Sequence, residues 1–156
     1  MARDGSQFLN AHVFPGGQID TLDNGNIRRA ALRELYEEAS LHLQPFPSTD
    51  LPHRVTPQAV QFNTSRTPFC QFLKISQAST AEDQLIPYSR WITPKMMLKR
   101  FDTTFFLALS CLTETPVDGK VDGKEIKSLA WLTPSEALSQ FSEGIITLFP
   151  PQWYLL

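Results

Sequence analysis

A proline and two glycines, Pro15-Gly16-Gly17, interrupt the chain just before a segment with helical periodicity, and this junction constrains the fold more than any other feature. Proline fixes its own φ, and paired glycines permit backbone angles that other residues avoid, so we expect a sharp loop. Residues 8–14 have the composition of a short strand. In residues 27–42 apolar side chains recur at helical spacing, which predicts a helix. We therefore expect a strand, a glycine loop and a helix in this order, with Asn24 or Asn26 as the helix cap.

Three glutamates, Glu34, Glu37 and Glu38, occupy positions i, i+3 and i+4 of this predicted helix. At this spacing their carboxylates project from one face and repel one another. A bound divalent cation offsets that repulsion, and Mg²⁺ and Mn²⁺ both take oxygen ligands. The glycine loop just upstream allows backbone to approach the same face. The pattern therefore favours a Mg²⁺ or Mn²⁺ site.

An ordinary solvated helix face explains the same glutamates without any metal. Arg33 stands four residues before Glu37, and such a pair forms a surface ion pair worth a few tenths of a kcal/mol. The glutamates alone do not separate these two interpretations.

Strand and helix patterns alternate along the rest of the chain, with proline-rich stretches between them. Residues 103–113 are apolar and β-prone enough to predict a central strand. Residues 67–76 suit either a short helix or a strand. Thr133 and Glu136 form a capping-box pattern for a helix at residues 134–142. Other expected features are strands at residues 88–93 and 125–132, a loop at 44–58, Asp-Gly turns at 117–124 and an end of regular structure at Pro150-Pro151.

The length of 156 residues suits one domain, residues 1–156, of the α/β class (α+β type), with a mixed sheet flanked by helices. A net charge of -2 predicts no nucleic-acid and no membrane partner. Cys70 and Cys111 have no framework spacing, which suggests a reducing, intracellular compartment. The sequence shows no targeting signal and leaves the oligomeric state open.

The glycine loop and the glutamates together resemble the signature of the Nudix hydrolase family, G-x5-E-x7-R-E-U-x-E-E-x-G-U, where U is aliphatic. The match begins at Gly17, meets an acid at Asp23 and continues through Arg33-Glu-Leu-Tyr-Glu-Glu-Ala-Ser-Leu41. The loop between Gly17 and Arg33 is two residues longer than the signature, and Ser40 replaces its last glycine. The longer loop is tolerable because loop length is cheap to change, and we expect Ser40 to alter the helix end more than the chemistry.

This resemblance implies roles for the matched residues. Glu37 and Glu38 would be the principal metal ligands, and Glu34 a further ligand or a base acting on water. Arg33 would be structural and hold a glutamate carboxylate in place. Gly17 would offer its backbone carbonyl to the metal.

A second resemblance rests on residues 89–94 (Ser-Arg-Trp-Ile-Thr-Pro), 99–108 (Lys-Arg-Phe-Asp-Thr-Thr-Phe-Phe-Leu-Ala) and 125–138. These segments look like the acyl-coenzyme A diphosphatase branch of the Nudix family, known from peroxisomes and mitochondria. It implies coenzyme A or acyl-coenzyme A, a small-molecule nucleoside diphosphate derivative, as substrate, and a peroxisomal or mitochondrial location. Gly16 and the loop would then approach the substrate, and Arg100 would bind a phosphate. Alternatively, the segment around Arg100 is a strand entry in which Arg100 pairs with Asp102.

The segment before the glycine loop is short for this family, because only 16 residues precede Gly17 and residues 1–7 are polar and irregular. We therefore expect the chain to be N-terminally truncated and to lack the first strand of the usual sheet. The alternative function is a catalytically inactive, truncated module that binds only nucleotide or metal.

Overall fold

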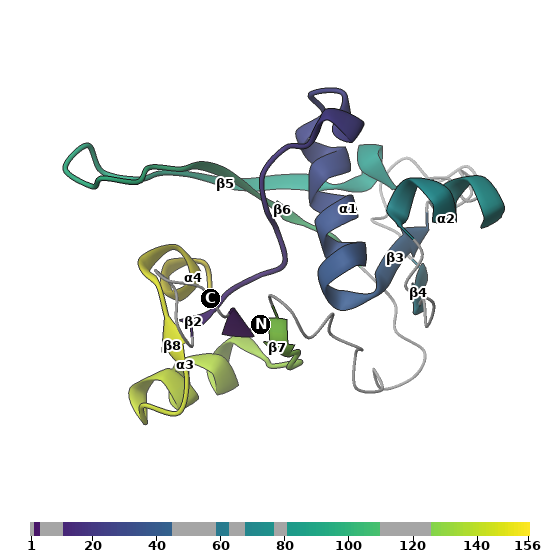
Figure 1. Ribbon diagram of the computed structural model, residues 1–156. Helices are drawn as coiled ribbons and strands as arrows, with labels where there is room; N and C mark the ends of the chain where they lie inside the picture. Colours follow the sequence, from purple (N-terminus) through teal and green to yellow (C-terminus); the bar gives the residue numbers. More distant parts are fainter. Residues whose placement is uncertain (1, 4–10, 45–58, 63–67, 77–80, 110–125) are drawn as a thin grey trace, which may run out of the picture.

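A computed structural model describes residues 2–3, 11–44, 59–62, 68–76, 81–109 and 126–156. Helices and short strands are interspersed along these ranges (Figure 1). Three sheets are present in them, one of four strands and two of two strands. The described part of the chain thus combines helices with a mixed sheet, as the sequence predicts.

The four-stranded sheet has the order β7 (Ile126–Ser128), β1 (Ala2–Arg3), β2 (Ala11–His12) and β8 (Thr147–Leu148). Its pairs are antiparallel between β7 and β1 and between β1 and β2, and parallel between β2 and β8. The expectation that residues 1–7 are irregular is wrong at β1, which lies inside the sheet. The strand expected at residues 8–14 is observed only as β2, and the one expected at 125–132 only as β7.

Helix α1, Ile27–Ala39, carries the glutamates. Asn26 caps it, because its side chain accepts hydrogen bonds from the backbone N–H groups of Arg28 and Arg29. The predicted extension to His42 is wrong. Ser40 adopts the left-handed conformation at φ 57°, which ends the helix. Strand β3, Leu41–Gln44, follows at once and pairs antiparallel with β4, Ala59–Phe62.

Strands β5, Ile86–Ile92, and β6, Asp102–Leu107, form an antiparallel ribbon. Figure 1 shows this ribbon extending outward, with its turn at the far end from α1. The prediction of a central strand at residues 103–113 is wrong for the described part of the chain, where β6 pairs with β5 alone. Apolar composition indicates a strand but does not fix how many neighbours that strand has.

The remaining helices test three predictions. Residues 67–76, left open between helix and strand, contain helix α2, Phe69–Ser76. Helix α3, Pro134–Ser142, is confirmed, with Thr133 and Glu136 in the predicted capping box. Pro150-Pro151 does not end regular structure but begins helix α4, Pro150–Leu155, since proline is tolerated in a first helical turn.

Two short 3-10 helices, η1 (Thr21–Asp23) and η2 (Glu82–Gln84), complete the described elements. The loop expected at residues 44–58 and the turns at 117–124 lie outside the described residues, except that Gln44 belongs to β3. Within the described ranges no helix is long and apolar enough to cross a bilayer.

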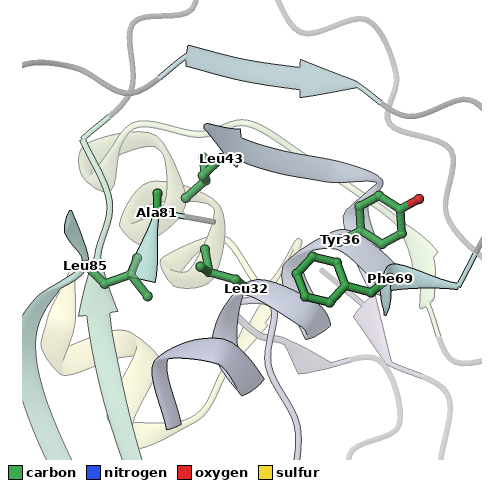
Figure 2. Close-up of a cluster of buried hydrophobic side chains, with 6 residues drawn as sticks. All are labelled: Leu32, Tyr36, Leu43, Phe69, Ala81 and Leu85. Atoms are coloured by element: carbon green, nitrogen blue, oxygen red, sulfur yellow. The ribbon is translucent and has the colours of Figure 1, made fainter. Parts of the chain in front are cut away.

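The hydrophobic core packs the inner face of α1 against α2, β3 and the segment that leads into β5 (Figure 2). The Tyr36 ring lies 5.4 Å from the Phe69 ring and 4.9 Å from the Phe72 ring, measured between centroids. Burying such side chains contributes roughly 1.5–3 kcal/mol each, so α1 is held mainly by this face. The buried members of the cluster are Leu32, Tyr36, Leu43, Phe69, Ala81 and Leu85.

Candidate functional site

The glycine loop lies directly against the glutamate face of α1. The backbone N–H of Gly16 donates a hydrogen bond to Oε2 of Glu38 at 2.9 Å. At Gly17 a Cβ atom would stand 2.3 Å from Oε1 of Glu34, so no larger residue fits while Glu34 keeps its position. The structure therefore brings the loop together with two of the three predicted glutamates.

Arg33 is buried beside these glutamates and binds several oxygen acceptors at once. Its Nη1 donates to Oε1 of Glu34 at 2.9 Å and to Oε2 of Glu37 at 3.0 Å. Its Nε and Nη2 bind the Asp23 carboxylate at 3.0 Å each, and Nη2 also donates to the backbone carbonyl of Gln18 at 2.9 Å. Arg33 thus connects the loop, η1 and two of the glutamates.

Asp23 stands where the signature has glutamate, and it is almost fully buried, with 1% of its surface exposed. It accepts a hydrogen bond from the backbone N–H of Asp20 at 2.7 Å, while Asp20 accepts one from Leu22 at 2.9 Å. This reciprocal capping fixes η1. The match of Asp23 to the acid of the signature suggests, with Asp20, a part in organising the loop, and both residues have that part in the structure.

Arg33 and the backbone of Asp20 favour the ionised form of Asp23. Burial alone would raise the pKa of the Asp23 carboxyl, but the hydrogen bonds from Arg33, the hydrogen bond from the backbone of Asp20 and the charge of Arg33 together outweigh burial and hold that pKa below its ordinary value of 3.8. The pKa of Arg33 is raised, first by its hydrogen bonds to Asp23. Both groups are therefore charged at neutral pH.

Because the folded-state pKa of Asp23 is lowered, the Asp23–Arg33 pair stabilises the fold above the ordinary pKa. As the pH falls below 3.8 the unfolded state takes up the proton first, and this stabilisation is lost towards the folded-state pKa. We expect Asp23→Asn to lose less stability than the unchanged chain between neutral pH and about pH 2. Thermal unfolding across that range measures this difference, and parallel curves for the two proteins would contradict it.

The three glutamates differ in exposure. Glu38 is buried, Glu34 is largely buried, and the Glu37 side chain is 42% exposed. Within the described ranges, no three His, Cys, Asp or Glu side chains are gathered closely enough to hold a metal ion. Arg33 occupies an oxygen of both Glu34 and Glu37, so a divalent cation would compete with Arg33 for them. The donor set of carboxylate and backbone oxygens nevertheless fits a hard cation.

A second polar cluster, unforeseen from the sequence, anchors the N-terminus of α1. The Glu82 carboxylate accepts from Asn26 Nδ2 at 2.6 Å and from Arg29 Nε at 2.8 Å. Its backbone carbonyl accepts from Arg28 Nη1 at 3.0 Å. These partners are more than 50 residues apart in sequence, and no local pattern signals such a contact.

Arg100 lies in the exposed turn between β5 and β6. Figure 1 shows this turn at the end of the ribbon that is far from α1. Its Nε donates to the backbone carbonyl of Thr93 at 3.0 Å. The alternative pairing with Asp102 is wrong, since Asp102 binds Arg90, whose Nε lies 2.7 Å from Oδ1. The structure therefore does not bring Arg100 together with the loop and the glutamates.

Comparison with known proteins identifies the family. Residues 25–156 match the family model described as the NUDT19 Nudix domain. The chain is 34% identical over 148 residues to an acyl-coenzyme A diphosphatase NUDT19 of Xenopus laevis and 31% identical over 150 residues to that of Gallus gallus. Each alignment covers 83% of this chain but only 38% and 39% of the two relatives. The chain thus spans well under half the length of these relatives.

A solved structure shares the fold. The crystal structure of a NUDIX hydrolase from Alicyclobacillus acidocaldarius superposes with a TM-score of 0.70, covering 97% of this chain and 77% of that one. The two sequences are 19% identical, so this likeness shows the fold alone, and it confirms the predicted Nudix-like α+β architecture. The glycine loop, the glutamate helix and the matched family model together show that the chain belongs to the Nudix hydrolase family, in the branch of the NUDT19 Nudix domain.

Proposed function

We propose that this chain hydrolyses a diphosphate linkage in a nucleoside diphosphate derivative, with coenzyme A or an acyl-coenzyme A as substrate. The observation that carries the proposal is the contact of the glycine loop with two glutamates of α1, through Gly16 to Glu38 and Gly17 to Glu34. The names of the relatives in Xenopus laevis and Gallus gallus, acyl-coenzyme A diphosphatases, support the choice of substrate.

The proposed metal is Mg²⁺ or Mn²⁺, held by Glu37 and Glu38, with the backbone carbonyl of Gly17. When bound, such an ion neutralises diphosphate charge and lowers the pKa of a water molecule. Glu34 either completes the ligand set or accepts a proton from the attacking water. Arg33 positions Glu34 and Glu37 through its paired hydrogen bonds.

The chemistry is a displacement at phosphorus. The oxygen of a water molecule forms a bond to one phosphorus atom of the diphosphate, and the bond from that phosphorus to the bridging oxygen breaks. The bridging oxygen leaves with the second phosphate, and the water proton passes to a carboxylate. From coenzyme A this gives a phosphopantetheine and adenosine 3',5'-bisphosphate.

The direct test is hydrolysis of coenzyme A and of an acyl-coenzyme A by the purified chain, with Mn²⁺, with Mg²⁺ and with excess chelator. Products are separated and identified by mass spectrometry. Metal-dependent release of adenosine 3',5'-bisphosphate supports the proposal. If both substrates stay intact in the presence of each metal, the proposal is wrong for this chain.

Gly17→Ala tests the close approach of the loop to α1. The added methyl group would meet the carboxylate of Glu34, a flexible side-chain end that moves more easily than backbone. We expect kcat to fall by about 10- to 100-fold, because small displacements of a reacting group are costly, while the free energy of unfolding changes by less than about 1 kcal/mol. Steady-state kinetics and urea unfolding measure the two effects. An unchanged kcat would show that the position of Glu34 does not matter.

A second candidate function is a non-catalytic module that binds nucleotide or metal only. The hydrogen bonds of Arg33 favour it, because they already satisfy oxygens of Glu34 and Glu37 without an ion. Calorimetry with Mn²⁺ and coenzyme A separates the two functions. Heat of binding without product supports the module, and the absence of heat at millimolar ligand contradicts both candidates.

A further inference from the structure

The turn between β5 and β6 presents three consecutive apolar side chains to solvent. Met96 is 88% exposed, Met97 54% and Leu98 106%. Single exposed apolar residues are common, but a contiguous group at a projecting point marks an interaction surface. Figure 1 shows the turn at the outer end of the ribbon, beyond the rest of the described elements. We call residues 94–100 the ribbon tip.

The ribbon tip is also strongly basic. Lys95, Lys99 and Arg100 flank the apolar residues, and no acidic residue occurs between Asp83 and Asp102. Behind the tip, the Asp102 carboxylate is engaged by Arg90. The net charge of -2, from which the sequence predicts no membrane partner, is a sum over the whole chain. It conceals the three positive charges that are concentrated at the ribbon tip. A partner for this surface must be both anionic and able to accept apolar side chains.

Hydrogen bonds close the base of the ribbon tip and the turn within it. The backbone N–H of Thr93 donates to the carbonyl of Phe101 at 2.9 Å, and the N–H of Phe101 donates to Oγ1 of Thr93 at 2.9 Å. The N–H of Met97 donates to the carbonyl of Pro94 at 3.1 Å, closing the turn. The tip therefore presents its apolar residues without a large ordering cost on binding.

From this combination we infer that the ribbon tip docks on an anionic lipid bilayer. A convex point with apolar residues between cations matches a layer of headgroup phosphates above a deformable apolar interior. Met96 and Leu98 enter the boundary between headgroups and acyl chains, and the flanking cations lie at the phosphates. A soluble acidic protein would satisfy the charges but would need a groove to receive the apolar point. This inference is independent of the proposed hydrolysis.

The test is co-sedimentation of the full chain with vesicles of phosphatidylcholine alone and of phosphatidylcholine mixed with phosphatidylserine. We expect binding to the mixed vesicles that weakens as salt is raised, because screening shortens the reach of the cations. Lys95→Gln with Lys99→Gln should weaken that binding about 25-fold, since each cation near an anionic surface contributes about fivefold. Met96→Ser with Leu98→Ser should weaken it about tenfold or more.

Ile145→Ser is the matched control, because Ile145 is 64% exposed but lies in the turn after α3, outside the ribbon. It should leave vesicle binding unchanged. Circular dichroism checks that all variants fold, as expected for residues this exposed. The inference fails if the chain binds neither type of vesicle, or if the variant with Met96→Ser and Leu98→Ser binds as well as the unchanged chain. It also fails if the chain binds soluble polyglutamate but not the mixed vesicles.

Discussion

Glu38→Gln is expected to lower kcat for coenzyme A hydrolysis on the order of 100-fold or more without unfolding the chain. Glu38 is buried and accepts a hydrogen bond from the backbone of Gly16. Glutamine keeps an oxygen for that hydrogen bond, so the loop keeps its contact. It removes the negative charge that a divalent cation needs from a principal ligand.

The measurement combines steady-state kinetics with calorimetric titration of Mn²⁺, so that turnover and metal affinity are separated. Glu143→Gln is the control, because Glu143 is exposed and accepts its hydrogen bond from Ser139 at the end of α3. It should change neither quantity. Equal activity in Glu38→Gln and the unchanged chain would remove Glu38 from the metal site.

Arg33→Met should lower the free energy of unfolding by about 3–5 kcal/mol, because it leaves the buried Asp23 carboxylate without its cation. Methionine roughly preserves the unbranched shape of the side chain, so lost packing is a minor part of the effect. Urea unfolding followed by circular dichroism gives the value. Adding Asp23→Asn to Arg33→Met should recover part of the loss, since the uncompensated charge then disappears.

Arg90→Met is the matched control for Arg33→Met. Arg90 also binds an aspartate through two nitrogens, but the side chains of both partners are more than half exposed. Exposed ion pairs typically contribute less than about 1 kcal/mol. If the two substitutions proved equally destabilising, the burial of the Asp23–Arg33 pair would not be the cause.

The helix that carries the glutamates was predictable because its signals are local. Asn26 is a typical cap, and apolar residues repeat at helical spacing up to Ala39. Its end was not predictable from periodicity, since Leu41 and Leu43 continue the apolar pattern and yet also alternate as a strand. The helix ends because Ser40 adopts the left-handed conformation, and the pattern of apolar residues carries no information about this backbone angle.

The site was predictable where it follows the signature and not where it depends on distant contacts. The loop and the glutamates meet as the spacing from Gly17 to Glu38 implies. Arg100 does not join them, because its position depends on where the β5–β6 ribbon projects. The contacts of Glu82 were not predictable for the same reason, because its partners Asn26 and Arg29 become its neighbours only in the folded chain.

The direct passage from α1 into β3 through Ser40 has a consequence for how this chain can vary in length. Only one residue, Ser40, separates the end of α1 from the start of β3. An inserted residue there would move either the glutamates away from the glycine loop or Leu41 and Leu43 out of their buried positions. On the other side, the segment between Gly17 and Arg33 already holds two residues more than the signature, and it contains η1. We therefore expect changes of length to be tolerated in the loop before the helix and not at the junction after it.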